Sequence, residues 1–167
     1  VQPGDYATFR VGYAQLDDEG LRTVKGKAFD DRAGCAVLVE VLNEDYALDV
    51  WAAFTAQEEV GLRGARVAAY RVNPDVAIAL EGTICDDLPR EADVSPVTQV
   101  GKGPAISFMD NSVIADSRLV SLLTRVAEEQ GIPYQYKRAV AGGTDSGAIQ
   151  LTREGIPAVT VAVPTRY

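Results

Sequence analysis

The sequence predicts an α/β fold, with a mostly parallel sheet and helices on both of its faces. Apolar runs of strand length, such as residues 76–80, alternate along the chain with helical stretches. Parallel strands must be joined by crossovers, so this alternation favours a sheet with helices packed against it. A chain of 167 residues with 47% hydrophobic and 24% charged residues can fold around one core.

The first elements are expected at the following places. Residues 4–13 begin with Gly-Asp and continue with β-branched and aromatic residues, which predicts a turn and then a half-exposed strand, and residues 21–29 are expected to resume a strand. Asp31 is a good N-cap, and residues 33–42 are apolar almost all round, which predicts a helix buried on most faces. Residues 50–56 form a continuous apolar run, typical of a strand covered on both sides.

The second half repeats the alternation. Leu119, Leu122, Leu123 and Val126 form the stripe of an amphipathic helix that begins near Asp116 and stops at Gly131. Residues 97–100 and 105–109 are extended segments expected at an edge or in an antiparallel excursion. The remaining elements are a short helix at 62–70, the strand at 76–80, a short helix ending near Glu154 and a last strand at 156–163.

Charge and composition exclude several classes of function. With 16 basic and 24 acidic residues the net charge is −8, which repels phosphate backbones and anionic lipids, so neither nucleic acid nor a membrane is an expected partner. No histidine occurs, which excludes Ser/His, Cys/His and HExxH sites from this chain. Cys35 and Cys85 form no CxxC motif, and we expect buried thiols of a cytoplasmic protein. The start at Val1 and the stop at Tyr167, after an apolar run, suggest a fragment.

Carboxylates follow the predicted strands. Asp30 ends one predicted strand, Glu58 and Glu59 end another, and Glu81 ends a third, and the carboxyl ends of strands are where ligands bind in open α/β sheets. Taken singly, each would be a solvated strand end, and one of the adjacent glutamates should point away. Together they would repel one another unless a multivalent cation neutralised them, so at least one should have a raised pKa without metal. Oxygen ligands alone favour Mg, Mn or Ca, whereas Zn or Co would want imidazole.

Gly142 and Gly143 precede a predicted helix and leave other functions open. This loop could cradle an anion, as in a Mg-dependent phosphohydrolase or a nucleotide-binding α/β domain. It lacks the Lys-Ser/Thr of a phosphate loop, so a plain capped turn is the simpler interpretation. A third possibility is a non-catalytic piece that folds only with a missing half.

Three segments carry a resemblance to a known family. They are KAFDDRAGC at 27–35, TAQEEVGLRGA at 55–65 and AGGTDSGA at 141–148. In this order and spacing they resemble the glutamyl/deblocking aminopeptidases of metallopeptidase family forty-two, the tetrahedral-particle aminopeptidases, some of which are described as cellulases or endoglucanases. The resemblance spans essentially the whole chain.

The resemblance implies a zinc-exopeptidase-like fold and a two-metal aminopeptidase, usually with Zn or Co, that removes N-terminal residues from peptides. Asp30 would bridge both metals, Glu59 and Glu81 would be terminal ligands, and Glu58 would be the general base. The loop of Gly142, Gly143, Thr144 and Asp145 would lie beside the substrate. The complete protein would be a homo-oligomer, from a dimer up to a dodecamer.

The resemblance also implies that the chain is a partial member. The family's two metal-binding histidines are absent, so metal binding should be weak and hydrolysis marginal. Residues 1–22 would be the end of a β-rich dimerisation domain, and residues 23–167 part of the catalytic α/β domain. An incomplete sheet should expose strand edges and apolar surface, so the isolated chain should associate or be poorly stable.

Overall fold

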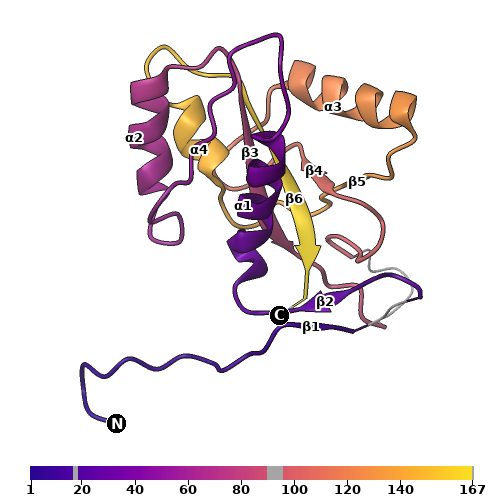
Figure 1. Cartoon of the computed structure of the whole chain (residues 1–167). Coiled ribbons are helices and arrows are strands. Elements are labelled where there is room, and N and C mark those ends of the chain that lie inside the picture. Colours follow the sequence, from indigo (N-terminus) through magenta and orange to yellow (C-terminus); the bar gives the residue numbers. More distant parts are fainter. Residues whose placement is uncertain (17–18, 90–95, 167) are drawn as a thin grey trace.

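A four-stranded mixed sheet forms the centre of the protein (Figure 1). The computed structural model describes residues 1–16, 19–89 and 96–166. The strands lie in the order β3-β6-β4-β5 and comprise β3 (Ala77–Ile84), β4 (Ala105–Ser107), β5 (Gln135–Tyr136) and β6 (Ala158–Thr165). A separate two-stranded ribbon pairs β1 (Ala14–Gln15) with β2 (Val24–Lys25).

The pairing confirms the predicted α/β class. β3 and β6 run parallel along all eight residues, from the pair Ala77 and Ala158 onward. β4 lies antiparallel to β6 and parallel to β5, so the expected antiparallel excursion occurs at β4. The long parallel β3–β6 pair holds the middle of β3 rigidly, which matters for the site because Glu81 lies there.

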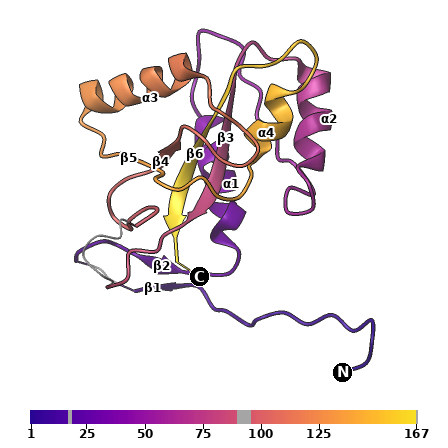
Figure 2. The same ribbon diagram turned by 180° about the vertical axis from the view of Figure 1, so that it is seen from behind.

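Helices cover both faces of the sheet. They are α1 (Phe29–Val41), α2 (Arg63–Val72), α3 (Ser117–Gln130) and α4 (Asp145–Gln150). Adjacent residues of a strand point to opposite faces, and Val159 of β6 packs against α3 whereas Thr160 bonds to α4. Figure 2 shows the molecule from behind, with α1 beyond the strands. Within the described residues, no helix is both long and apolar enough to cross a membrane.

The core is small and lies between α3 and the sheet. Its buried members are Ile106, Ala115, Leu119 and Val159. α3 begins and ends where the sequence predicts, because its termini have local signals: the Asp116 side chain accepts from the N–H of Arg118 at 2.9 Å, and Gly131 adopts φ 64° at the C-cap.

Some predicted strands are absent. Residues 4–13 and 50–56 contain no strand, residues 97–100 contain none either, and the segment 21–29 contains only the two residues of β2. Phe9 and Trp51 are largely exposed, Trp51 to 73%. An apolar run becomes a strand only when another strand supplies backbone hydrogen bonds, and no described strand lies alongside residues 50–56.

Two burial predictions were wrong. α1 was expected to be buried on most faces, yet Gly34 is its one buried residue and Val37 and Val39 are exposed. Cys35, on the same helix, is exposed, because α1 covers the sheet with one side and meets no second layer among the described residues. Cys85 is buried as expected, and its thiol bonds to the carbonyl of Thr98 at 3.3 Å.

Candidate metal centre

Glu81 lies in the middle of β3 and is 6% exposed. It was expected at the end of a strand ending near residue 80, but pairing with β6 continues β3 to Ile84. Glu81 therefore points out of the face of the sheet, on the side that α4 covers. Its Oε1 accepts a hydrogen bond from the backbone N–H of Asp145 at 3.2 Å.

Glu58 lies in the turn that leads into α2. Its carbonyl oxygen accepts from the N–H groups of Gly61 at 3.0 Å and Leu62 at 2.9 Å, which fixes the turn. Gly64, at the start of α2, packs so closely on Ala56 that a Cβ there would lie 2.5 Å from its backbone nitrogen. Glu58 is half-buried, whereas the next residue, Glu59, is exposed, so the two adjacent glutamates differ in their access to solvent.

Asp145 is the first residue of α4 and is buried. Its Oδ2 accepts a hydrogen bond of 2.6 Å from the hydroxyl of Thr55. Its Oδ1 is buried and has no hydrogen-bond partner in the part of the chain that the structure describes. The resemblance assigned Asp145 to the substrate loop, and we did not expect it among the clustered carboxylates.

Glu58, Glu81 and Asp145 form a cluster, which we call the carboxylate cluster. Each offers an oxygen, and these oxygens lie within 4.8 Å of one another. Burial, together with the charges of Glu59 and other neighbouring carboxylates, raises the pKa of Glu58 to about 7. Burial, opposed by the Asp145 N–H and reinforced by nearby carboxylates, raises the pKa of Glu81 to about 8. Burial also raises the pKa of Asp145. The expected raised carboxylate pKa is confirmed.

Asp30 and Asp31 lie at the start of α1, next to the cluster. A Cβ on Gly82 would lie 2.8 Å from the Cβ of Asp30, so Asp30 packs against β3 one residue after Glu81. Oδ1 of Asp31 accepts from the N–H of Gly34 at 2.9 Å. Burial and the charge of Asp30 outweigh that bond and raise the pKa of Asp31 to about 6.

The four predicted site carboxylates are thus only partly brought together. Glu58 and Glu81 are in the carboxylate cluster, whereas Asp30 and Glu59 lie beside it and act on Glu58 through their charges. The donor set fits a divalent cation: all ligand atoms are oxygens, they repel one another, and Asp145 has a buried oxygen without a partner in the described chain.

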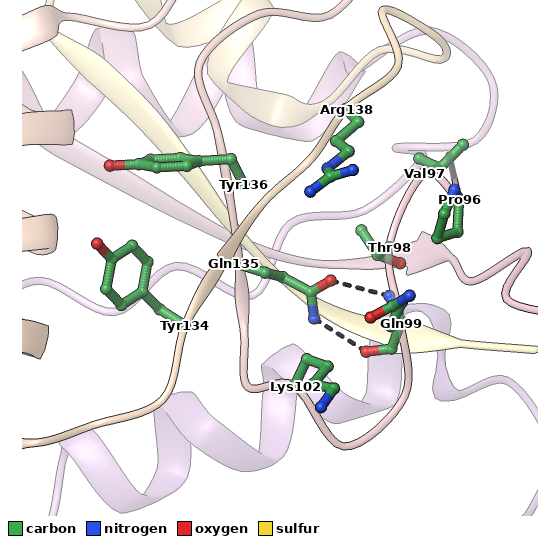
Figure 3. A pocket seen from close by; sticks show the side chains of 9 residues that line it. All are labelled: Pro96, Val97, Thr98, Gln99, Lys102, Tyr134, Gln135, Tyr136 and Arg138. Carbon is green, nitrogen blue, oxygen red and sulfur yellow. Dashed lines mark hydrogen bonds between the residues drawn. The ribbon is translucent and has the colours of Figure 1, made fainter. Parts of the chain in front are cut away.

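The described chain also contains a pocket of about 510 Å³ away from these carboxylates, beside β5 (Figure 3). Gln135 is one of its lining residues: Oε1 accepts from the N–H of Gln99 at 2.8 Å, and Nε2 donates to the carbonyl of Gln99 at 2.9 Å. The rings of Tyr134 and Tyr136 meet edge to face, with centroids 5.6 Å apart. The two charged residues that line the pocket, Lys102 and Arg138, are exposed, so the pocket is an open surface feature.

Comparisons with known proteins show which sequences and folds the chain is similar to. A protein of Acetivibrio thermocellus named "Putative aminopeptidase" is 43% identical over 169 residues, covering 100% of this chain and 49% of that protein. The solved structure of aminopeptidase APDkam598 from the archaeon Desulfurococcus kamchatkensis has 41% identity and a TM-score of 0.82, covering 86% of this chain and 42% of that one. The TET1 peptidase of Pyrococcus horikoshii has 33% identity and a TM-score of 0.76, covering 100% and 48%.

The chain spans about half the length of the curated relatives that it matches. The sequence model of the M42 glutamyl aminopeptidases matches residues 1–167, which is the whole chain. This metallopeptidase family implies divalent metal ions, and the carboxylate cluster is compatible with them. By its sequence and by its fold, the chain belongs to the M42 glutamyl aminopeptidase family.

Proposed function

We propose that this chain provides the carboxylate half of the active site of a two-metal aminopeptidase, which removes N-terminal residues from peptides. The observation that carries the proposal is the carboxylate cluster, in a chain of the M42 family. Three neighbouring acidic groups with raised pKa values lower the stability of the fold, and such groups cluster at functional sites. The M42 match gives no support to the phosphohydrolase alternative.

The residues divide into cation ligands and a base. We assign Asp30 as the bridging ligand and Glu59 and Glu81 as terminal ligands of two divalent ions, with Zn or Co as the expected metals. When bound, such ions supply a water of lowered pKa and polarise the scissile carbonyl. Asp145 is a further candidate ligand, since its Oδ1 is buried without a hydrogen-bond partner among the described residues and one of its carboxylate oxygens lies within 4.8 Å of those of Glu58 and Glu81.

Glu58 suits the role of general base. A base works best when its pKa lies near the operating pH, and the pKa of Glu58 is raised to about 7. Its carboxylate is only half-buried, so a substrate and its water can reach it. The carbonyl bonds to Gly61 and Leu62 hold its backbone still, so the carboxylate does not depend on a flexible loop for its position.

The loop from Gly142 to Asp145 suits substrate binding. Because the N–H of Asp145 bonds to Glu81, the loop of Gly142, Gly143, Thr144 and Asp145 runs directly beside the cluster. Gly142 adopts φ 70°, a conformation that disfavours side chains, and no heavy atom lies within 4 Å of the place where its Cβ would be. An exposed backbone at this point is available to a peptide.

We propose that the protein self-associates. The P. horikoshii TET1 peptidase can assemble into a tetrahedron or a large octahedral shell. This chain exposes large apolar side chains, including Trp51, Phe54 and Ile84. We keep residues 1–22 as the end of a β-rich dimerisation domain and residues 23–167 as part of the catalytic domain, although the β1–β2 ribbon extends across that boundary.

Hydrolysis of aminoacyl p-nitroanilides by the gene product that contains this sequence, loaded with Zn²⁺ or Co²⁺, tests the proposal. Glu58→Gln should keep the metal and lower kcat by roughly 10²-fold or more, because an amide cannot accept a proton. Asp30→Ala should lose metal as well as activity. Glu129→Gln, on the exposed side of α3, is the matched control and should change neither.

Loss of metal from Glu58→Gln would show that Glu58 is a ligand rather than the base. Full activity in Asp30→Ala would refute the bridging role. The 167-residue chain by itself contains no histidine, and it should bind Zn²⁺ weakly and hydrolyse these substrates marginally.

A further inference from the structure

Asp110 is a buried acid outside the candidate metal centre. It lies between β4 and α3 and is 3% exposed. Its Oδ1 accepts three hydrogen bonds, from the N–H of Ser112 at 2.6 Å, the hydroxyl of Ser112 at 2.7 Å and the N–H of Val113 at 3.0 Å. Its Oδ2 accepts a fourth, from the hydroxyl of Thr144 at 3.0 Å. The carboxylate thus holds its own turn together and also reaches the loop before α4.

Three hydroxyls continue from Asp110 in a line, which we call the hydroxyl chain: Thr144, Thr160 and Ser146. The Thr144 and Thr160 hydroxyls are 2.8 Å apart, and those of Thr160 and Ser146 are also 2.8 Å apart. An ionised carboxylate can only accept, so Thr144 must use its single proton on Asp110. Thr160 must then donate to Thr144, and Ser146 to Thr160. The charge of Asp110 therefore orients every bond in the hydroxyl chain.

The hydroxyl chain holds the backbone on both sides of Asp145. Thr144 precedes Asp145 and Ser146 follows it, and both side chains are tied to Thr160 on the rigid strand β6. Between them, Asp145 donates its N–H to Glu81 and accepts from Thr55. The position of Asp145 in the carboxylate cluster is set by its two neighbours.

The Asp110 turn also contacts the loop and α4 directly. The N–H of Asn111 donates to the carbonyl of Gly142 at 2.9 Å, and Nε2 of Gln150 donates to the carbonyl of Ser112 at 2.8 Å. A Cβ on Gly147 would overlap the Ser112 side chain, so the backbone of α4 packs directly against this turn. The turn is therefore the support on which α4 and the loop before it are placed.

We propose that Asp110 is a positioning residue for the carboxylate cluster, acting through the hydroxyl chain on Asp145 and hence on Glu81. Asp110 touches none of the three clustered carboxylates in the interactions described above, so its effect is indirect. The metal-binding consequence rests on the function proposed above, whereas the placement of Asp145 does not. Removal of a residue that holds a metal ligand in position typically lowers metal affinity by roughly 10- to 100-fold.

Thr160→Val is the sharpest test, because it removes the central hydroxyl at nearly constant shape and leaves the cluster residues intact. Thr160→Ser restores the hydroxyl. Thr152→Val is the matched control, since Thr152 is also buried against α4 but donates to the carbonyl of Ala148, outside the hydroxyl chain. Asp110→Asn, which can no longer accept at both oxygens, is the second perturbation.

Two readouts separate placement from metal binding. The first is the hydrogen-exchange rate of the Asp145 amide in metal-free chain, relative to the core amide of Val159. The second is the affinity for Co²⁺ or Zn²⁺ by titration. In Thr160→Val and Asp110→Asn we expect the relative exchange to rise about tenfold and the affinity to fall roughly 10- to 100-fold. Thr160→Ser and Thr152→Val should stay within about twofold of the wild type.

The outcomes distinguish this inference from the proposed function. If the gene product that contains this sequence binds neither metal and the Asp145 amide still loosens in Thr160→Val, the metal site is refuted and the placement role stands. If the wild type binds metal and Thr160→Val binds it equally with unchanged exchange, the placement role is refuted. Equal increases in Asp145 amide exchange and equal losses of metal affinity in Thr160→Val and Thr152→Val would also refute the placement role. The effect would then follow from the loss of any buried hydroxyl near α4.

Discussion

Replacing Glu81 by glutamine should remove much of the pH dependence of stability in the metal-free chain. The pKa of Glu81 is about 8 in the folded state, against an ordinary value of 4.5. Below pH 4.5 the side chain is protonated whether or not the chain is folded. As the pH rises towards 8, the unfolded chain ionises freely while the folded chain keeps the proton, so stability is lost over this range. With about 1.4 kcal/mol for each pKa unit, the loss is on the order of 3–5 kcal/mol.

The assay is urea unfolding of the chain in EDTA at pH 5 and pH 8.5, followed by far-ultraviolet circular dichroism. The wild type should lose stability between the two pH values, and Glu81→Gln should lose less than half as much, with the remainder due to Glu58, Asp31 and Asp145, whose pKa values are also raised. Glu58 contributes less, because solvent screens its half-exposed carboxylate. Glu129→Gln should follow the wild type. The reasoning is refuted if Glu81→Gln and the wild type lose the same free energy of unfolding.

Three further substitutions follow from the packing. Gly82→Ala places a Cβ 2.8 Å from Cβ of Asp30; it should destabilise the chain by about 1–3 kcal/mol in urea unfolding, and a neutral result would mean that Asp30 yields freely. Leu119→Ala opens the core between α3 and the sheet and should cost about 2–5 kcal/mol by the same measurement. Thr55→Val removes the 2.6 Å bond to Asp145; thermal unfolding should report a loss of about 1–3 kcal/mol, and an unchanged midpoint would contradict the importance of that bond.

Elements with local signals could be predicted from the sequence. α3 has an N-cap at Asp116, a regular apolar stripe and a C-terminal Gly131, and the structure has it at the expected residues. β3 and β6 were also predicted, because each contains a continuous apolar run of strand length. In each case the information lies within the element itself.

Features that depend on distant partners could not be predicted. The run at 50–56 indicates apolarity but not which strand would pair with it, and β5 is too short and too polar to stand out. The place of Asp145 depends on Glu81, 64 residues earlier, and on Thr55, 90 residues earlier. No spacing within the sequence reveals such contacts.

The most direct test of the central claim, that the carboxylate cluster is a divalent-metal site, is the number of protons released when metal-free chain binds Zn²⁺ or Co²⁺. It is measured at pH 7 by calorimetric titration in buffers of different ionisation enthalpy. Because Glu58 and Glu81 have pKa values of about 7 and 8, binding should be saturable and should release about one to two protons per site. Glu81→Gln should weaken binding and release fewer protons. Saturable binding without proton release would contradict the claim. So would a metal affinity and a proton release that are unchanged in Glu81→Gln.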